Sequence, residues 1–209
     1  MKLSQFTLSL LSVLALGACS SSSGGDGLFD EARALSLKVG VDLENLNIET
    51  DIDVDDLPTS AEMRGVFVIV PLDDEGSRPD LPVFGRATAT ADFRAGSLRG
   101  AASGFRGYEL NEICEPSPEQ CTARSTGSWD GSLMITGLIE EIEFDYEVSG
   151  RLSGRIDGED VTIDAEGDGQ GVFGLIDDRL TAFGEGEGAG TLEGSTETIG
   201  FDHIMILQE

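Results

Sequence analysis

The chain has 209 residues, of which 13 are lysine or arginine and 40 are aspartate or glutamate, so its formal net charge is −27. A protein with such a negative field repels nucleic acids and anionic lipid surfaces, and we expect no nucleic acid among its partners. Glycine is abundant at 28 residues and proline is scarce at 6. This composition is typical of a sheet-rich protein rather than a helical one.

The N-terminal segment, residues 1–18, has the pattern of a secretory signal. A single charge at Lys2 precedes an apolar run, which ends in the small residues Gly17 and Ala18. A charged start, an apolar stretch of about 7–15 residues and a small-residue cleavage site indicate a signal peptide, which is too short to span a membrane. We therefore expect residues 1–18 to be removed.

Cys19 stands at the expected cleavage point, and Ser20 follows it. The segment resembles a bacterial lipoprotein signal with its lipobox. The resemblance implies that the Cys19 thiol takes a diacylglyceryl group, that palmitate-like acyl chains hold the protein to the membrane, and that Ser20 directs it to the outer membrane. Two or more acyl chains anchor a protein stably. The alternative is a plain signal peptide that happens to be followed by a cysteine.

The next segments connect this anchor to a domain. Residues 19–27 contain the lipidated cysteine and a flexible tether rich in serine and glycine. Residues 28–59 form a short lead-in, in which residues 29–35 can start a helix with Asp30 as its N-cap. Residues 60–209 form the main domain.

An acidic stretch in the lead-in has the spacing of positions 1, 3, 5 and 12 of a calcium-binding loop, at Asp51, Asp53, Asp55 and Glu62. However, Asp56 replaces the glycine of the sharp turn, and Pro58 falls inside the loop. With so many acidic residues in the chain, this spacing arises easily by chance. These four residues are a weak calcium candidate, and we expect no resident metal or cofactor.

Apolar and polar residues alternate from about Met63 almost to the end of the chain, which indicates β-strands. Residues 66–70 are apolar throughout and predict a strand that is buried on both faces. Residues 157–160 predict a hairpin turn. The clearest alternating runs cover residues 87–93, 133–139, 142–156, 161–165 and 201–207.

Short strands with frequent turn signals predict an antiparallel sheet that closes into a barrel or a sandwich. Glycine, alanine and serine on the inward faces favour a tight barrel over a wide cavity. We predict an all-β fold, a small antiparallel eight-stranded β-barrel preceded by a short lead-in segment that can be helical.

Two cysteines remain once Cys19 is assigned to lipid. Cys114 and Cys121 bracket residues 115–120, a polar loop with two prolines. In an oxidising envelope compartment we expect them to form a disulfide, which would stiffen an exposed loop and make it a plausible contact surface. A zinc site is the alternative.

The chemistry-bearing residues are otherwise sparse. His203 is the single histidine, and we predict a position at the barrel rim or exposed to solvent. Trp129 is predicted to lie in the core, and the alternative is a surface anchor. The sequence contains no Gly-x-Ser-x-Gly nucleophile turn. We assign no catalytic residues and predict that the protein is not an enzyme.

Several short motifs are similar to those of transferrin-binding protein B-like lipoproteins, over about residues 57–207. They are residues 57–60 before the first strand, residues 87–93 with 96–100, and residues 171–174 with 182–186. The resemblance implies an eight-stranded barrel on a lipid anchor at the outer membrane.

Together these features predict a monomeric, lipid-anchored binding module of the bacterial outer membrane, which faces either the cell surface or the periplasm. Its expected ligand is a protein or a nutrient-related molecule that carries iron or haem. The alternative is a non-catalytic structural or interaction lipoprotein of the envelope without a small-molecule ligand.

Overall fold

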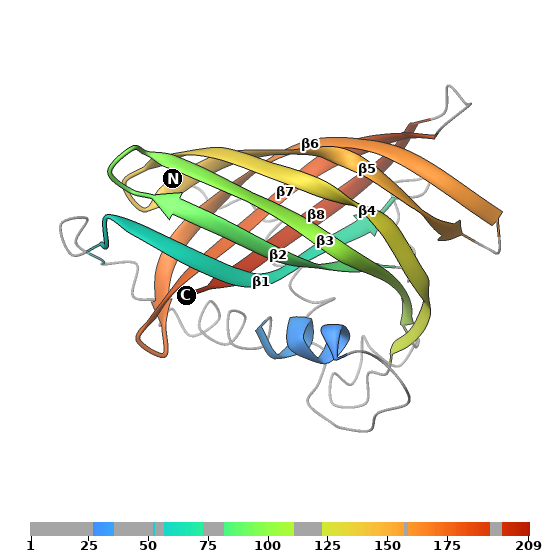
Figure 1. Cartoon of the computed structure of the whole chain (residues 1–209), viewed down its shortest axis with the longest axis horizontal. Helices are drawn as coiled ribbons and strands as arrows, with labels where there is room; N and C mark the ends of the chain where they lie inside the picture. The colour runs from blue at the N-terminus through green and yellow to red at the C-terminus, as the bar shows by residue number, and fades with distance from the viewer. Residues whose placement is uncertain are drawn as a thin grey trace.

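The structure, a computed structural model, describes residues 27–35, 52, 57–72, 82–110, 123–156, 159–192 and 198–209. It is a closed barrel of eight antiparallel strands, in which each strand pairs with the next and β8 pairs with β1 (Figure 1). The predicted fold class is confirmed. The strands are β1 (Ser60–Pro71), β2 (Val83–Asp92), β3 (Ser97–Leu110), β4 (Ala123–Glu140), β5 (Glu143–Ile156), β6 (Glu159–Ile176), β7 (Arg179–Leu192) and β8 (Thr198–Gln208).

Tight turns join the strands at one rim of the barrel. Residues 93–96 connect β2 to β3, residues 141–142 connect β4 to β5, and residues 177–178 connect β6 to β7. The first turn is held by the Ala95 N–H, which donates to the Asp92 carboxylate at 2.8 Å, and Gly96 adopts a positive φ of 62°. At the opposite rim, β3 ends at Leu110 and β4 begins at Ala123. Cys114 and Cys121 lie between these positions in the sequence, outside the described residues.

The alternation of the sequence places one apolar set inside the barrel. The inward side chains form a continuous core that reaches all eight strands. Trp129 belongs to this core and is only 7% exposed, so its predicted position is confirmed. The largest inward side chains, beside Trp129, are Phe67, Phe105, Phe144, Tyr146, Phe173 and Phe201.

Glycines on neighbouring strands make room for these rings. A β-carbon at Gly154 of β5 would overlap the Trp129 indole, and one at Gly169 of β6 would lie 2.6 Å from the Tyr146 ring. Because real β-carbons do not approach other carbons so closely, these inward positions exclude larger residues. The inward glycines therefore explain how a narrow barrel accommodates large aromatic side chains.

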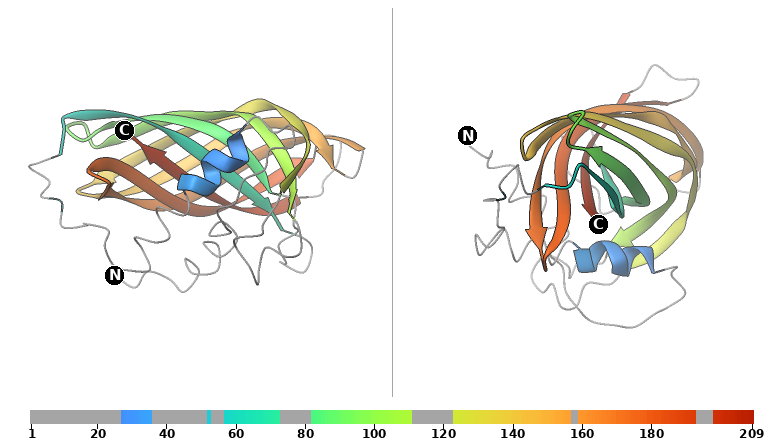
Figure 2. Two further views of the ribbon diagram at one scale, coloured as in Figure 1. Left: turned by 90° about the horizontal axis from the view of Figure 1, so that it is seen from below. Right: turned by 60° about the vertical axis from the view of Figure 1, so that its left-hand side comes forward.

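A short helix, residues 28–35, lies against the outside of the barrel (Figure 2). Its Leu28 and Ala32 are fully buried and belong to a second apolar cluster, which covers the outer face where β1 meets β8. The predicted burial of residues 66–70 on both faces is thus confirmed. The outward members of this cluster on β1 and β8 are Val66, Val68, Val70, Ile204 and Ile206.

Aromatic contacts and one ion pair fix the helix on the barrel wall. The centroid of the Phe29 ring lies 5.7 Å from that of Phe84 on β2 and 5.6 Å from that of Tyr108 on β3. Glu31 forms an ion pair with Arg86 of β2 at 3.6 Å.

The predicted N-cap of this helix is wrong, because the helix begins at residue 28 and Asp30 lies within its first turn. Gly27, with a positive φ of 76°, precedes the helix, and its carbonyl accepts from the Glu31 N–H at 2.8 Å. In the part of the chain that the structure describes, no helix has the length and apolarity needed to cross a membrane.

Candidate functional site

Most of the site residues predicted from the sequence lie outside the described residues, namely Cys19, Cys114, Cys121, Asp51, Asp53 and Asp55. Glu62, the last member of the calcium candidate, lies on β1 with an exposed side chain, opposite Thr90 of β2. Within the described ranges, no group of three or more histidine, cysteine, aspartate or glutamate residues is arranged to hold a metal ion.

His203 is where the structure departs most from the sequence-based expectation. The predicted rim or exposed position is wrong, because the imidazole is fully buried inside the barrel. It stacks on Phe67, with ring centroids 5.3 Å apart and an interplanar angle of 17°, and the Tyr146 ring meets it edge-on with centroids 5.5 Å apart. The physical reason is the period of two, which places His203 inward between Phe201 and Met205.

Burial determines the protonation of these two inward polar rings. Because the charged imidazolium would lose its hydration, burial lowers the pKa of His203 from 6.5 to about 4. Burial also raises the pKa of the Tyr146 hydroxyl well above its usual value, with smaller contributions from the negative charges of Glu185 and Asp168. Both groups are therefore neutral at pH 7.

The outer face of the same strands carries a row of carboxylates. Glu147 of β5 pairs with Asp168 of β6, Asp168 pairs with Glu187 of β7, and Glu187 pairs with Asp202 of β8. We call these four residues the carboxylate row. Since like charges directly opposite one another on adjacent strands are destabilising, the row costs the barrel stability.

A fifth carboxylate, Glu185, lies near the carboxylate row and has a raised pKa. Glu185 of β7 lies on the same outer face, two residues before Glu187. Partial burial raises the pKa of Glu185, and the neighbouring negative charge of Asp202 raises it further. The negative charge of the carboxylate row therefore also affects the protonation of Glu185, which lies outside the row.

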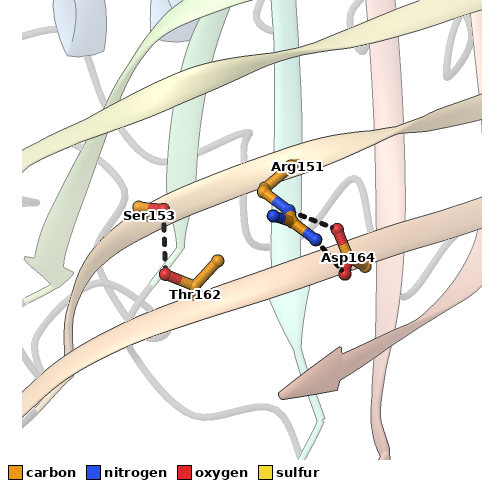
Figure 3. A network of polar contacts seen from close by, with 4 residues as sticks. All are labelled: Arg151, Ser153, Thr162 and Asp164. Carbon is orange, nitrogen blue, oxygen red and sulfur yellow. Dashed lines mark hydrogen bonds and ion pairs between the residues drawn. The ribbon is translucent and has the colours of Figure 1, made fainter. Parts of the chain in front are cut away.

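Strands β5 and β6 also carry opposite charges that face each other, on the part of this strand pair nearer the rim opposite the tight turns (Figure 3). The Arg151 guanidinium of β5 donates to both carboxylate oxygens of Asp164 on β6, at 2.6 and 2.8 Å, and this hydrogen bonding lowers the pKa of Asp164. Arg155 forms an ion pair with Asp160 at 3.0 Å. Opposite charges therefore face each other over one part of the β5–β6 ladder, and like charges over another.

Two large apolar side chains are exposed beside the carboxylate row. Met134 and Leu138 of β4 are 61% and 69% exposed. Thr136, which lies between them on the same face, pairs with Glu147, the first member of the row. We call the carboxylate row together with Met134 and Leu138 the acidic wall. It combines exposed apolar surface with a row of negatively charged side chains.

Sequence reasoning did not find the acidic wall. The alternation indicated which residues point outward, but the alignment of four carboxylates depends on the register of four strands. No local signal in the sequence encodes that register.

A scan against known protein families, a search of curated proteins and a search of solved structures find no match to this chain.

Proposed function

We propose that this protein is a lipid-anchored module of the bacterial outer membrane that binds a protein partner through the outside of its barrel. The observation that carries the proposal is how the side chains are divided between the two faces of the barrel wall. The inward side chains are buried and fill the barrel, whereas the outward side chains include exposed charged and apolar groups.

The packed interior argues against a ligand carried within the barrel. Phe67, Phe144, Tyr146 and Phe173 are each at most 2% exposed, and their rings pack against one another or against His203. A haem-sized ligand inside would have to displace several of these rings. Of the ligands that we expected from the sequence, a protein therefore fits this barrel better than a haem held in its lumen.

The acidic wall indicates the chemistry of the partner. A basic surface placed over Glu147, Asp168 and Glu187 would relieve the like-charge repulsion along the row. Met134 and Leu138 would supply apolar contact at its edge. Charge complementarity of this kind increases association rates and selects among partners.

The outward residues also suit a barrel that stands in water on a tether. Glu143, Asp145 and Glu147 of β5 all point outward and are exposed. A membrane-spanning barrel carries apolar residues at such positions and polar residues inside. We therefore place the barrel outside the bilayer, with residues 19–27 as its connection to the lipid.

The test of this proposal is capture of a partner by the soluble domain, residues 20–209, from extracts of the native host. We expect a partner that is retained at low salt, released at high salt, and lost with the triple variant Glu147→Gln, Asp168→Asn and Glu187→Gln. The matched control changes the same charge at exposed positions away from the wall, with Glu62→Gln, Asp178→Asn and Glu209→Gln.

Two results would count against the proposal. Retention by the triple variant equal to that of the wild type would exclude the acidic wall as the contact surface. Recovery of nothing above background by the wild-type domain, with its cysteines oxidised or reduced, would favour a structural lipoprotein of the envelope instead.

The anchor is tested separately by Cys19→Ala in the full chain. Because the thiol is the proposed lipid attachment point, we expect the variant to leave the membrane pellet for the soluble fraction. Its far-ultraviolet circular dichroism should still show the barrel. If the variant sediments with membranes as the wild type does, lipid attachment at Cys19 is wrong.

A further inference from the structure

Three buried polar atoms inside the barrel have no hydrogen-bond partner among the described residues. They are the Tyr146 hydroxyl and both ring nitrogens of His203. An unsatisfied buried polar group costs the free energy that its lost hydration would have supplied, and native proteins rarely tolerate it. Three such atoms in adjacent rings therefore require an explanation.

The two side chains have complementary hydrogen-bonding capacity. A neutral imidazole has one N–H donor and one acceptor nitrogen, and a phenol has one donor and an acceptor oxygen. The rings meet edge-on at 5.5 Å between centroids with an interplanar angle of 76°, and the structure contains no direct hydrogen bond between them. A group that both donates and accepts would satisfy the hydroxyl and one of the two ring nitrogens at once.

The surroundings of the pair favour a small neutral occupant. Burial keeps both rings uncharged, and the carboxylates of Asp168 and Glu187 lie on the outer face of the wall. The inward positions of β6 and β7 that flank these rings are glycines. A β-carbon at Gly167 would lie 3.3 Å from His203 Cε1, and one at Gly184 would lie only 2.8 Å from Tyr146 Cε1. The rings therefore pack closely against these strands, and any occupant beside them must be small.

We propose that a buried water molecule bridges the Tyr146 hydroxyl and the His203 imidazole. Water has two donors and two acceptors, and buried waters in proteins make about three hydrogen bonds to otherwise unsatisfied polar groups. A metal ion is disfavoured, because a neutral histidine and a protonated phenol among aromatic rings supply no compensating charge. The site is a polar link inside an apolar core and is independent of binding at the acidic wall.

The variant Tyr146→Phe tests the bridge by the sign of its effect, because it removes the hydroxyl and keeps the ring. If water satisfies the hydroxyl, the variant loses that hydrogen bond, and its melting temperature should fall by about 2–4 °C. If the hydroxyl is unsatisfied, its removal relieves a desolvation cost, and the melting temperature should rise. A rise would overturn the proposal.

A double-mutant cycle between Tyr146→Phe and His203→Phe tests whether the two groups share one partner. Both substitutions keep an aromatic ring, so the cycle isolates the polar link from the ring contact. A shared water predicts that the second substitution has a much smaller effect once the first is present. Fully additive shifts in melting temperature would contradict a shared water.

Direct detection separates the bridge from a hydrogen bond made by the two side chains alone. In the wild-type protein, we expect nuclear Overhauser contacts between a long-lived water and the Tyr146 hydroxyl proton, and none in Tyr146→Phe. A crystal structure at high resolution should show one water within hydrogen-bond distance of both groups. A direct Tyr146–His203 hydrogen bond without water would refute the proposal.

Discussion

Lowering the pH from 7.5 to 5 is expected to reduce the free energy of unfolding of the barrel by about 2 kcal/mol through His203 alone. The reason is that His203 is neutral and fully buried in the folded barrel, with its pKa lowered to about 4, whereas the unfolded chain has the usual value of 6.5. The unfolded state therefore binds the proton more tightly.

The direction of the effect follows from this difference. Between pH 6.5 and about 4 the unfolded chain carries the proton and the folded barrel does not, so stability falls as the pH falls. The contribution of His203 is fully present above pH 6.5, and below about pH 4 no more is lost. The total loss amounts to about 3 kcal/mol.

The groups around His203 do not supply an alternative source of this effect. Of the side chains that contact it, Phe67 and Phe201 do not titrate, and Tyr146 titrates only at high pH. On the outer face of the neighbouring strands, Glu185 has a raised pKa, so its protonation in acid stabilises the folded barrel and opposes the effect of His203.

Urea unfolding at several pH values between 5 and 7.5 measures this dependence, with His203→Phe as the matched variant. We expect the wild type to lose stability over this range and the variant to lose little or to gain. Parallel pH profiles for the two proteins would show that His203 is not the responsible group.

The variant Gly154→Ala is expected to cost about 1–3 kcal/mol, the range for forcing an extra methyl group into a packed core. The added β-carbon would overlap the indole of Trp129, which is 7% exposed and packed in the barrel core. Trp129 is the single tryptophan of the chain, so its fluorescence reports on this contact. We expect the emission to shift to the red as the ring is pushed toward solvent.

Two further variants show whether the ring is the cause. Gly200→Ala on β8 is the control, since its β-carbon would lie at an ordinary 3.6 Å from Leu72, and it should be close to neutral. Trp129→Leu should be destabilising alone. Gly154→Ala should lower the free energy of unfolding much less in the Trp129→Leu background than in the wild type. Equal effects of the two alanine substitutions would contradict the close packing of Gly154 against Trp129.

Much of the fold was accessible from the sequence, because the period of two directly reports which side chains point inward. The runs at residues 133–139 and 142–156 predicted inward faces that the structure confirms. The apolar stretch at residues 66–70 predicted burial on both faces, and the structure adds the reason, which is the helix that packs on β1.

The candidate site was far less accessible, for two physical reasons. His203 is polar, and propensity favoured a rim or exposed position, yet its place in the alternation put it inside the barrel with Tyr146. The carboxylate row depends on register between distant strands, which a single sequence does not reveal. Neither feature has a local motif.

The most direct test of recognition by the outer wall compares stability and binding in the same variant. Neutralising Glu147, Asp168 and Glu187 with glutamine or asparagine removes like-charge repulsion, so the melting temperature should rise or stay unchanged. Its affinity for the captured partner, measured by calorimetry, should fall at least about tenfold, in line with the loss of several charge contacts. Unchanged affinity in a variant that folds as well as the wild type would contradict recognition by the acidic wall.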